Sequence, residues 1–270
     1  MKKNLLIGAI SGNYCINDIR NWVVSAKKVL TDNDQIYILA YNYESNDPVI
    51  EYLISNNIEV LMPDIDMWGH SIEKFETNTG LMNSHNSYKL IHNVRFLHIW
   101  WLLSSVDYNQ ILITDVKDVI VNKRPFKDED IEDCIVASSE VIKYGEHQWN
   151  KEHILQTFGL AGVQLLEQEV NNVGVLYGKG SVVKELCLDI YLNAINKTKV
   201  ADQTAFNYLI RNSYKDKTIF TDLEDKWAVH LHVVNEGLVP FDLHQLKHYT
   251  IIHQYDRLGD EIFNYYTIPQ

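Results

Sequence analysis

The sequence predicts a single α/β domain in which a mostly parallel central sheet is flanked by helices. Strand-like apolar runs alternate along the chain with helical patterns, as in folds whose sheet is covered on both faces. The run at residues 5–10 is continuously apolar, which is typical of a strand buried on both sides. The chain has 270 residues, of which 46% are hydrophobic, so it can bury one large core.

The first half of the chain begins with the strand at residues 5–10. A helix follows, which Asn17 or Asp18 can cap, with apolar residues at helical spacing up to Leu30. Pro48 suits the first turn of a second helix. The polar segment at residues 64–86 is long enough to be a substrate-covering loop. The other elements expected here are strands at residues 36–41, 59–62 and 110–114 and a helix at residues 88–106.

The second half is less regular, and apolar runs are its main signal. Residues 140–160 mix polar, aromatic and glycine residues, and we expect an extended connection there. No boundary is sharp enough to divide the chain, so a single domain over residues 1–270 is expected. The predicted elements are strands at residues 135–137, 173–177, 219–220 and 249–252 and helices at residues 182–195 and 202–211.

Charge and cysteine content narrow the classes of function. The net charge is −12 and the longest basic cluster is Lys123-Arg124, so no nucleic-acid partner is expected. The three cysteines are odd in number and far apart, which suits a reducing compartment. The start of the chain lacks a cleavage pattern and no apolar run reaches 18 residues. We expect a cytoplasmic protein without a transmembrane segment, either free or peripheral to a membrane.

Asp115 and Asp118 directly follow the apolar run at residues 110–114. Ligands of open α/β sheets bind at the carboxyl ends of strands. Two carboxylates without an adjacent arginine repel each other unless a cation joins them, and Mg²⁺ and Mn²⁺ prefer oxygen ligands. The spacing therefore indicates a metal site for a diphosphate. A solvated turn in which an aspartate caps the next element would give the same spacing.

Four segments, in order, resemble the GT-A glycosyltransferases. The first resembles their aspartate motif, with Asp115-x-x-Asp118 in place of the common Asp-x-Asp, followed by Pro125-Phe126. The second resembles their Asn-x-Gly strand beside the donor sugar, the third their Asp-Gln pair, and the fourth a strand that ends in a metal-binding histidine. The last three lie at residues 171–178, 201–207 and 251–257, and the similarity spans roughly residues 4–257.

The resemblance implies a GT-A, Rossmann-like fold and a divalent metal, Mn²⁺ or Mg²⁺, held by Asp115, Asp118 and His253. It leaves open which aspartate binds the metal directly. The nucleotide-binding part would cover about residues 1–125, and the sugar and acceptor part about residues 126–270. The partners would be a nucleotide-sugar donor, by default a UDP-sugar, and a glycan or glycoconjugate acceptor. The oligomeric state is open.

Several residues are candidates for donor and sugar binding, each with a structural alternative. Arg95, on an apolar helix, needs a buried anion and would point to the donor, or else it would extend to solvent. Arg257 would neutralise the diphosphate or form a surface pair with Asp256 or Asp260. Asp202 would bind sugar hydroxyls together with Gln203, although aspartate also caps helices. Further candidates are Ser11 and Tyr14 at the end of the first strand, and Asn172 and Gly174, the latter of which could also mark a bulge.

The expected activity is transfer of a hexosyl or pentosyl group to a hydroxyl acceptor. If the anomeric configuration is inverted, Glu140 or Asp202 would act as the base. If it is retained, no dedicated base is expected. Two alternatives remain: an inactive sugar-nucleotide or protein-binding module of the same fold, and a phosphohydrolase with Asp115 as nucleophile. The latter usually requires an aspartate two residues later, where this chain has Lys117.

Overall fold

The computed structural model describes residues 2–63, 90–195, 200–238 and 240–258. Its centre is a seven-stranded sheet with the strand order β3-β2-β1-β4-β7-β6-β8. Four of the six neighbouring strand pairs are parallel, and only β7 runs against its neighbours β4 and β6. The expected mostly parallel sheet flanked by helices is thereby confirmed.

Most of the predicted elements form close to their expected bounds. The strands of the central sheet are β1 (Asn4–Ser11), β2 (Asp34–Tyr41), β3 (Glu59–Leu61), β4 (Gln110–Thr114), β6 (Ile135–Lys143), β7 (Glu169–Lys179) and β8 (Thr218–Thr221). The longer helices are α1 (Ile16–Val29), α2 (Pro48–Ser55), α4 (Ile91–Ser105), α5 (Gln148–Phe158), α7 (Gly180–Ala194) and α8 (Asp202–Arg211). Short helical segments complete the chain: α6 (Leu160–Val163), α9 (His232–Asn235), η2 (Lys215–Lys217), η3 (Leu243–His248) and η4 (Tyr255–Leu258).

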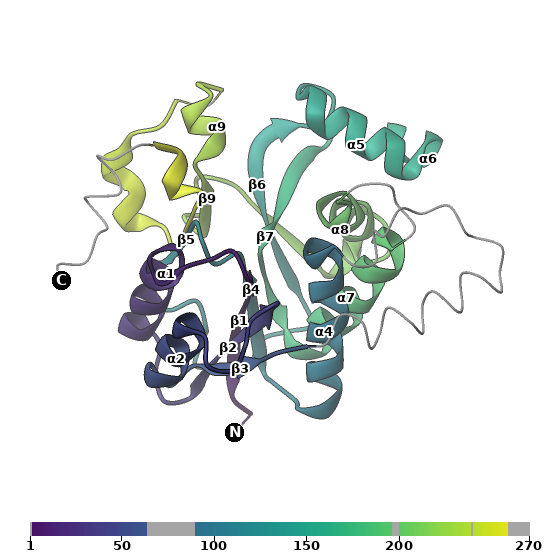
Figure 1. Ribbon diagram of the computed structural model, residues 1–270. Helices are drawn as coiled ribbons and strands as arrows, with labels where there is room; N and C mark the ends of the chain where they lie inside the picture. Colours follow the sequence, from purple (N-terminus) through teal and green to yellow (C-terminus); the bar gives the residue numbers. More distant parts are fainter. Residues whose placement is uncertain (1, 64–89, 196–199, 239, 259–270) are drawn as a thin grey trace, which may run out of the picture.

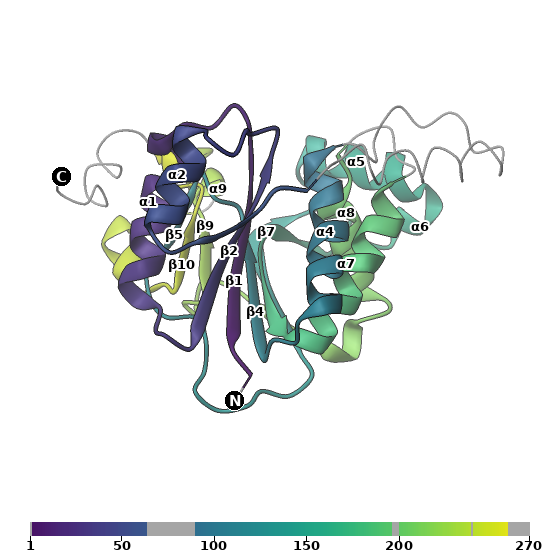
Figure 2. The ribbon, with the colours of Figure 1, turned by 60° about the horizontal axis from the view of Figure 1, so that its bottom comes forward.

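Helices cover both faces of the central sheet, and this explains its continuously apolar strands. Successive side chains of a strand point to opposite faces. Leu5 and Ile7 pack in the core beneath α4, α7 and α8, while Leu6 and Ile10 pack in the core beneath α1 and α2. In Figures 1 and 2 the two groups of helices lie on either side of the sheet. The predicted buried first strand thus contributes to both cores.

A second, three-stranded sheet lies beside α1. It consists of β5 (Val119–Val121), β10 (Ile251–His253) and β9 (Ala228–His230), in the order β5-β10-β9. Its buried residues Val119, Val121 and Ile251 belong to the core that also holds α1. Because β5 begins directly after the turn of Asp118, this sheet brings the C-terminal strand β10 to the end of β4.

Because β7 runs antiparallel to β4, its first residues lie at the carboxyl edge of the sheet. Thr114 at the end of β4 pairs with Val175, and Gln110 at its start pairs with Lys179. The first residues of β7 therefore lie at the edge where β1 and β4 end. Asn172 and Gly174 reach the carboxyl edge of the sheet only because their strand is antiparallel.

Some sequence-based expectations need correction. Residues 140–160 are not an extended connection, because β6 continues to Lys143 and α5 begins at Gln148. Neither Asn17 nor Asp18 is the cap of α1. The helix begins at Ile16, and the carboxylate of Asp18 in its first turn accepts a hydrogen bond from the backbone N–H of Cys15 at 2.8 Å. The loop expected at residues 64–86 lies outside the described residues.

In the ranges that the structure describes, no helix combines the length and the apolar character that crossing a bilayer requires.

Candidate active site

Asp115, Asp118 and His253 converge at the carboxyl edge of the central sheet. Asp115 directly follows β4, Asp118 directly precedes β5, and His253 is the last residue of β10. One ligand atom from each side chain lies within 4.8 Å of the other two. His253 Nε2 is 3.6 Å from both Asp115 Oδ2 and Asp118 Oδ1. The structure thus brings together the three residues that the sequence suggested as metal ligands.

This cluster fits a divalent cation by its chemistry and its dimensions. Two carboxylates and a neutral imidazole suit Mn²⁺ or Mg²⁺. Bonds of about 2.1 Å place neighbouring ligands roughly 3 Å apart and opposite ligands roughly 4 Å apart, which brackets the observed 3.6 Å. Gly174 leaves room here, because a Cβ atom at this position would lie 2.6 Å from Asp115 Oδ2 and 2.7 Å from His253 Cε1. The Asp115 side chain is 37% exposed, so the cluster is accessible from outside.

The pKa values of the cluster reflect its crowded charges. Burial by itself would raise the pKa of the Asp115 carboxyl, but Arg95 and His253 hold that pKa well below its usual range. Burial raises the pKa of Asp118; the His253 imidazole opposes this rise and the Asp115 carboxylate adds to it. Burial lowers the pKa of His253, but Asp118 and Asp115 together raise it. Both aspartates thus bias the site toward a positive charge, which a proton or a cation can supply.

Arg95 connects this cluster to the helix α8. Its side chain, 6% exposed, donates to Asp115 Oδ1 at 2.5 Å and to Asp202 Oδ2 at 3.1 Å. The sequence suggested a buried anion for this arginine, and the structure supplies two. Burial alone would lower the pKa of Arg95, but Asp115 and Asp202 raise it above its ordinary value. Arg95 therefore neutralises part of the acidic cluster and fixes the positions of both carboxylates.

Asn172 connects Gly174 with the buried carboxylate of Glu140. Its side-chain oxygen accepts from the Gly174 N–H at 2.8 Å, and its amide nitrogen donates to Glu140 Oε1 at 2.5 Å. The register between β6 and β7 shifts on both sides of Ser139, the residue before Glu140, and Val141 has a φ of 62°. A positive φ is costly for a β-branched residue, and such bulges are frequent next to active sites. The irregularity turns Glu140 inward, where it is 2% exposed.

Glu140 also faces His232, a residue that the sequence did not suggest. His232 Nε2 lies 3.5 Å from Glu140 Oε2, and His232 Nδ1 is 2.6 Å from Gln254 Oε1. Burial raises the pKa of Glu140, against the opposing effects of His232 and Asn172. A buried carboxyl with a raised pKa holds a proton more readily than an exposed one, which suits it to proton transfer.

Ser11 is the last residue of β1 and Tyr14 lies in the turn that follows, at the same sheet edge. The Tyr14 N–H donates to the Ser11 carbonyl at 2.9 Å, and the Tyr43 hydroxyl donates to the carbonyls of both residues. Tyr14 also lines a pocket of about 390 Å³, together with residues 15–17 and 47–49. Burial raises the pKa of Tyr14, and Asp115 and Asp118 add to the rise. This tyrosine thus stands between the pocket and the acidic cluster.

The remaining candidates differ in their surroundings. Asp202 is 5% exposed at the start of α8, and its Oδ1 accepts from the Gln203 N–H at 2.9 Å. The helix cap is Ala201, so capping does not account for Asp202. Arg257 is 56% exposed and pairs with Asp256 at 3.3 Å. The surface pair expected as the alternative for Arg257 is therefore present, although the charge of Arg257 also opposes the rise in the pKa of Asp118.

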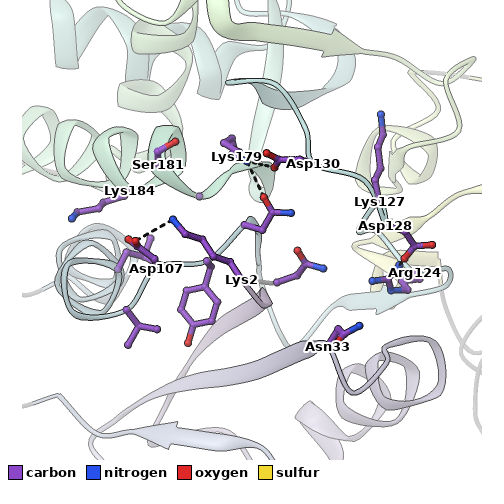
Figure 3. A pocket seen from close by; sticks show the side chains of 16 residues that line it. Lys2, Asn33, Asp107, Arg124, Lys127, Asp128, Asp130, Lys179, Ser181 and Lys184 are labelled. Carbon is purple, nitrogen blue, oxygen red and sulfur yellow. Dashed lines mark hydrogen bonds and ion pairs between the residues drawn. The ribbon is translucent and has the colours of Figure 1, made fainter.

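Another pocket, of about 430 Å³, lies at the opposite edge of the sheet (Figure 3). It is lined by the starts of β1 and β4 and by the end of β7, which is the amino edge of the parallel strands. Its charges are largely paired, with Lys2 on Asp107 and Lys179 on Asp130. Its paired charges do not form an acidic cluster like that of Asp115, Asp118 and His253. We therefore assign the active site to the carboxyl edge.

Comparison with known proteins identifies the fold. No protein-family profile and no curated sequence matches the chain. Mouse xyloside xylosyltransferase 1, solved in its apo form, superposes with a TM-score of 0.54 at 14% identity, over 93% of this chain and 97% of that one. The galactosyltransferase LgtC, solved with donor and acceptor sugar analogs, superposes with a TM-score of 0.55 at 17% identity, over 98% of each chain. The chain has the GT-A fold.

In this GT-A fold the acidic cluster lies at the edge where open α/β sheets bind their ligands. Sequence reasoning missed two histidines beside it, His230 and His232. His230 follows a short apolar stretch, and the pattern Ala228-Val229-His230 parallels Ile251-Ile252-His253. This similarity between the two triplets could have pointed to His230, since both triplets form strands of the second sheet of the GT-A fold.

Proposed function

We propose that the protein is a metal-dependent glycosyltransferase, which moves a sugar from a nucleotide-diphosphate donor to a hydroxyl acceptor on a glycan or glycoconjugate. The observation that carries the proposal is the convergence of Asp115, Asp118 and His253 on a GT-A fold. Two solved structures of this fold are named as sugar transferases, and one of them holds donor and acceptor sugar analogs. A UDP-sugar is the donor that the resemblance favours.

The two aspartates and His253 would hold Mn²⁺ or Mg²⁺. When bound, the cation supplies Lewis-acid and electrostatic stabilisation of the charge that develops on the leaving nucleotide diphosphate. Arg95 keeps Asp115 in place, and Arg257 is close enough to influence the charge of Asp118. The pocket beside Tyr14 is large enough for a nucleoside and lies at the same edge.

On the sugar side, Asn172, Gly174, Asp202 and Gln203 would surround the transferred group. The two candidate bases can be distinguished by their contacts. Asp202 gives one oxygen to Arg95 and the other to the Gln203 N–H, so it holds these neighbouring groups in place. Glu140 has a raised pKa and keeps Oε2 toward His232. If the reaction inverts the anomeric centre, Glu140 is therefore the better base.

The proposal is tested by incubating the protein with a panel of nucleotide sugars and Mn²⁺ and measuring the release of nucleotide diphosphate, with and without acceptor glycans. We expect activity that excess chelator abolishes. Asp115→Asn and Asp118→Asn each remove one charge from the cluster, and we expect each to lower kcat/KM by on the order of 100-fold or more.

Asp107→Asn is the matched control, because this exposed aspartate pairs with Lys2 at the opposite sheet edge. It should leave the activity unchanged. Full activity in excess chelator would contradict the proposal. Tight binding of a nucleotide sugar without turnover over a broad acceptor panel would instead identify a binding module, and release of phosphate from a simple phosphomonoester would identify a phosphohydrolase.

A further inference from the structure

His230 lies directly behind His253, on the neighbouring strand of the second sheet. The two residues are register partners in the parallel pair of β9 and β10, so their side chains share one face. Their Nδ1 atoms are 3.0 Å apart, and each residue is 1% exposed. The other ring nitrogen of His230, Nε2, is 2.9 Å from the hydroxyl of Ser138 on β6. A buried chain of hydrogen bonds thus runs from Ser138 through His230 to His253.

The position of one proton decides whether these hydrogen bonds leave His253 able to bind a cation. A cation at the cluster would be bound through Nε2 of His253, because this is the atom that faces Asp115 and Asp118. A neutral imidazole that presents a lone pair at Nε2 carries its hydrogen at Nδ1. That hydrogen then points at His230 Nδ1, which must be bare to accept it. His230 in turn carries its hydrogen at Nε2 and donates it to Ser138 Oγ.

We propose that His230 is a positioning residue that holds His253 in the tautomer required for cation binding, through the hydrogen-bond chain to Ser138. The inference rests on the proposed cation site and adds to it a residue that touches neither cation nor substrate. Ligating histidines commonly donate their second ring N–H to a carboxylate, a carbonyl or water. Here a second imidazole takes that position.

Because His230 and His253 are both buried, the Nδ1–H of His253 needs a hydrogen-bond acceptor within the protein. Without His230 the Nδ1–H of His253 would have no acceptor among the residues that the structure describes, which is costly for a buried donor. The ring would then favour the opposite tautomer, with its hydrogen at Nε2 donated to the aspartates. That hydrogen occupies the position that a cation needs. Loss of an outer partner of this kind typically lowers metal affinity by about 10–100-fold.

Three substitutions of His230 separate this role from simple packing. The side-chain amide of Asn can place an oxygen near the position of His Nδ1, whereas the longer Gln places its amide near the position of Nε2. His230→Asn therefore preserves an acceptor for His253. His230→Gln preserves only the contact with Ser138, and His230→Leu removes both. Asn and Gln have the same chemistry, so the two variants form a matched pair.

The affinity for Mn²⁺ is measured by the electron paramagnetic resonance signal of the free ion, and the unfolding free energy of each variant is measured in parallel. We expect His230→Leu and His230→Gln to weaken Mn²⁺ binding by about 10–100-fold, and His230→Asn to stay within about threefold of the unsubstituted protein. ¹⁵N NMR of the Mg²⁺-loaded protein should show His253 with its hydrogen at Nδ1 in the unsubstituted protein and in His230→Asn.

The results distinguish a failure of the role proposed for His230 from a failure of the cation site on which that role rests. Unchanged Mn²⁺ affinity in His230→Gln, or equal losses in the Asn and Leu variants, would overturn the role of His230 while the cation site stands. If the unsubstituted protein binds Mn²⁺ no better than Asp118→Asn does, the cation site itself is wrong and the inference is overturned with it.

Discussion

His98 lies on the buried side of α4, where its Nδ1 is 2.9 Å from the hydroxyl of Tyr41 at the end of β2. It is 1% exposed and its Nε2 atom has no hydrogen-bond partner among the described residues. A second proton on this ring would place a charge in the apolar core beside Phe96 and Leu97. Burial accordingly lowers the pKa of His98 to about 4.

This lowered pKa predicts a loss of stability on acidification. Between pH 6.5 and about pH 4 the unfolded chain binds a proton at His98 that the folded chain does not bind, so the free energy of unfolding decreases as the pH falls. The difference between the two pKa values corresponds to about 3 kcal/mol. In His98→Asn, whose amide can still meet Tyr41, denaturant unfolding at pH 7 and pH 4.5 should show a smaller loss.

The exposed His92 on the same helix offers the control, since His92→Asn should leave the pH dependence as it is. An equally steep loss of stability in His98→Asn would show that other groups cause it.

Site residues could be predicted from the sequence where the neighbouring residues form a recognisable pattern. Asp115 and Asp118 follow an apolar strand, a signal that a solvated turn would share, and His253 was distinguished from the other histidines by the resemblance of residues 251–257 to the GT-A glycosyltransferases. Arg95 was recognised as a residue that needs a buried anion, but its two partners lie 20 and 107 positions further along the chain. Such pairings depend on how helices dock, which no local pattern records.

At the scale of elements, Asn207 attaches α8 to the start of β7. Its side chain accepts from the Asn171 N–H at 2.8 Å and donates to the Asn171 carbonyl at 2.7 Å. It is 0% exposed. One amide thus satisfies both backbone groups of a strand residue next to Asn172, and it holds the helix that carries Asp202 against the site.

Asn207→Leu should therefore separate these two elements. It leaves the buried N–H and C=O of Asn171 without this partner, and each such group costs about 1–3 kcal/mol. We expect denaturant unfolding to show a loss of about 2–4 kcal/mol, with faster hydrogen exchange at the Asn171 amide. Asn212→Leu changes an exposed residue that follows the same helix; it removes a bond to the Tyr208 carbonyl that water can replace, and should cost less than about 1 kcal/mol. A similar loss in both variants would contradict the role of Asn207.

The elements that the sequence missed have weak local signals. Only Asn150, His153 and Ile154 are buried in α5, so its apolar periodicity is faint. The strands β5 and β9 have three residues each and are stabilised by pairing with β10, which is distant in sequence from both. By contrast, β4 and α8 have buried apolar faces strong enough to be recognised locally.

At the scale of the whole molecule, a cation and a nucleotide diphosphate that bind only the folded chain should stabilise all of it. The gain is about 2.7 kcal/mol when the ligand is at 100 times its Kd. We expect Mn²⁺ and a nucleotide sugar together to raise the Tm by several degrees in a thermal-shift assay. Asp118→Asn should lose this rise, whereas Lys184→Ala at the opposite pocket should keep it. An equal rise in both variants would place the ligand elsewhere.

The reversed direction of β7 has an implication for how such a protein can diversify. Asp115 and Gly174 are joined in sequence by almost sixty residues, yet their separation in space is fixed by the β4–β7 ladder and by the bond from the Asp115 N–H to the Gly174 carbonyl. The outer loops between β5 and β7 can thus lengthen, shorten or be exchanged without changing the distance between Asp115 and Gly174. Under the proposed function, such changes would alter acceptor preference while the chemistry at the donor stays constant.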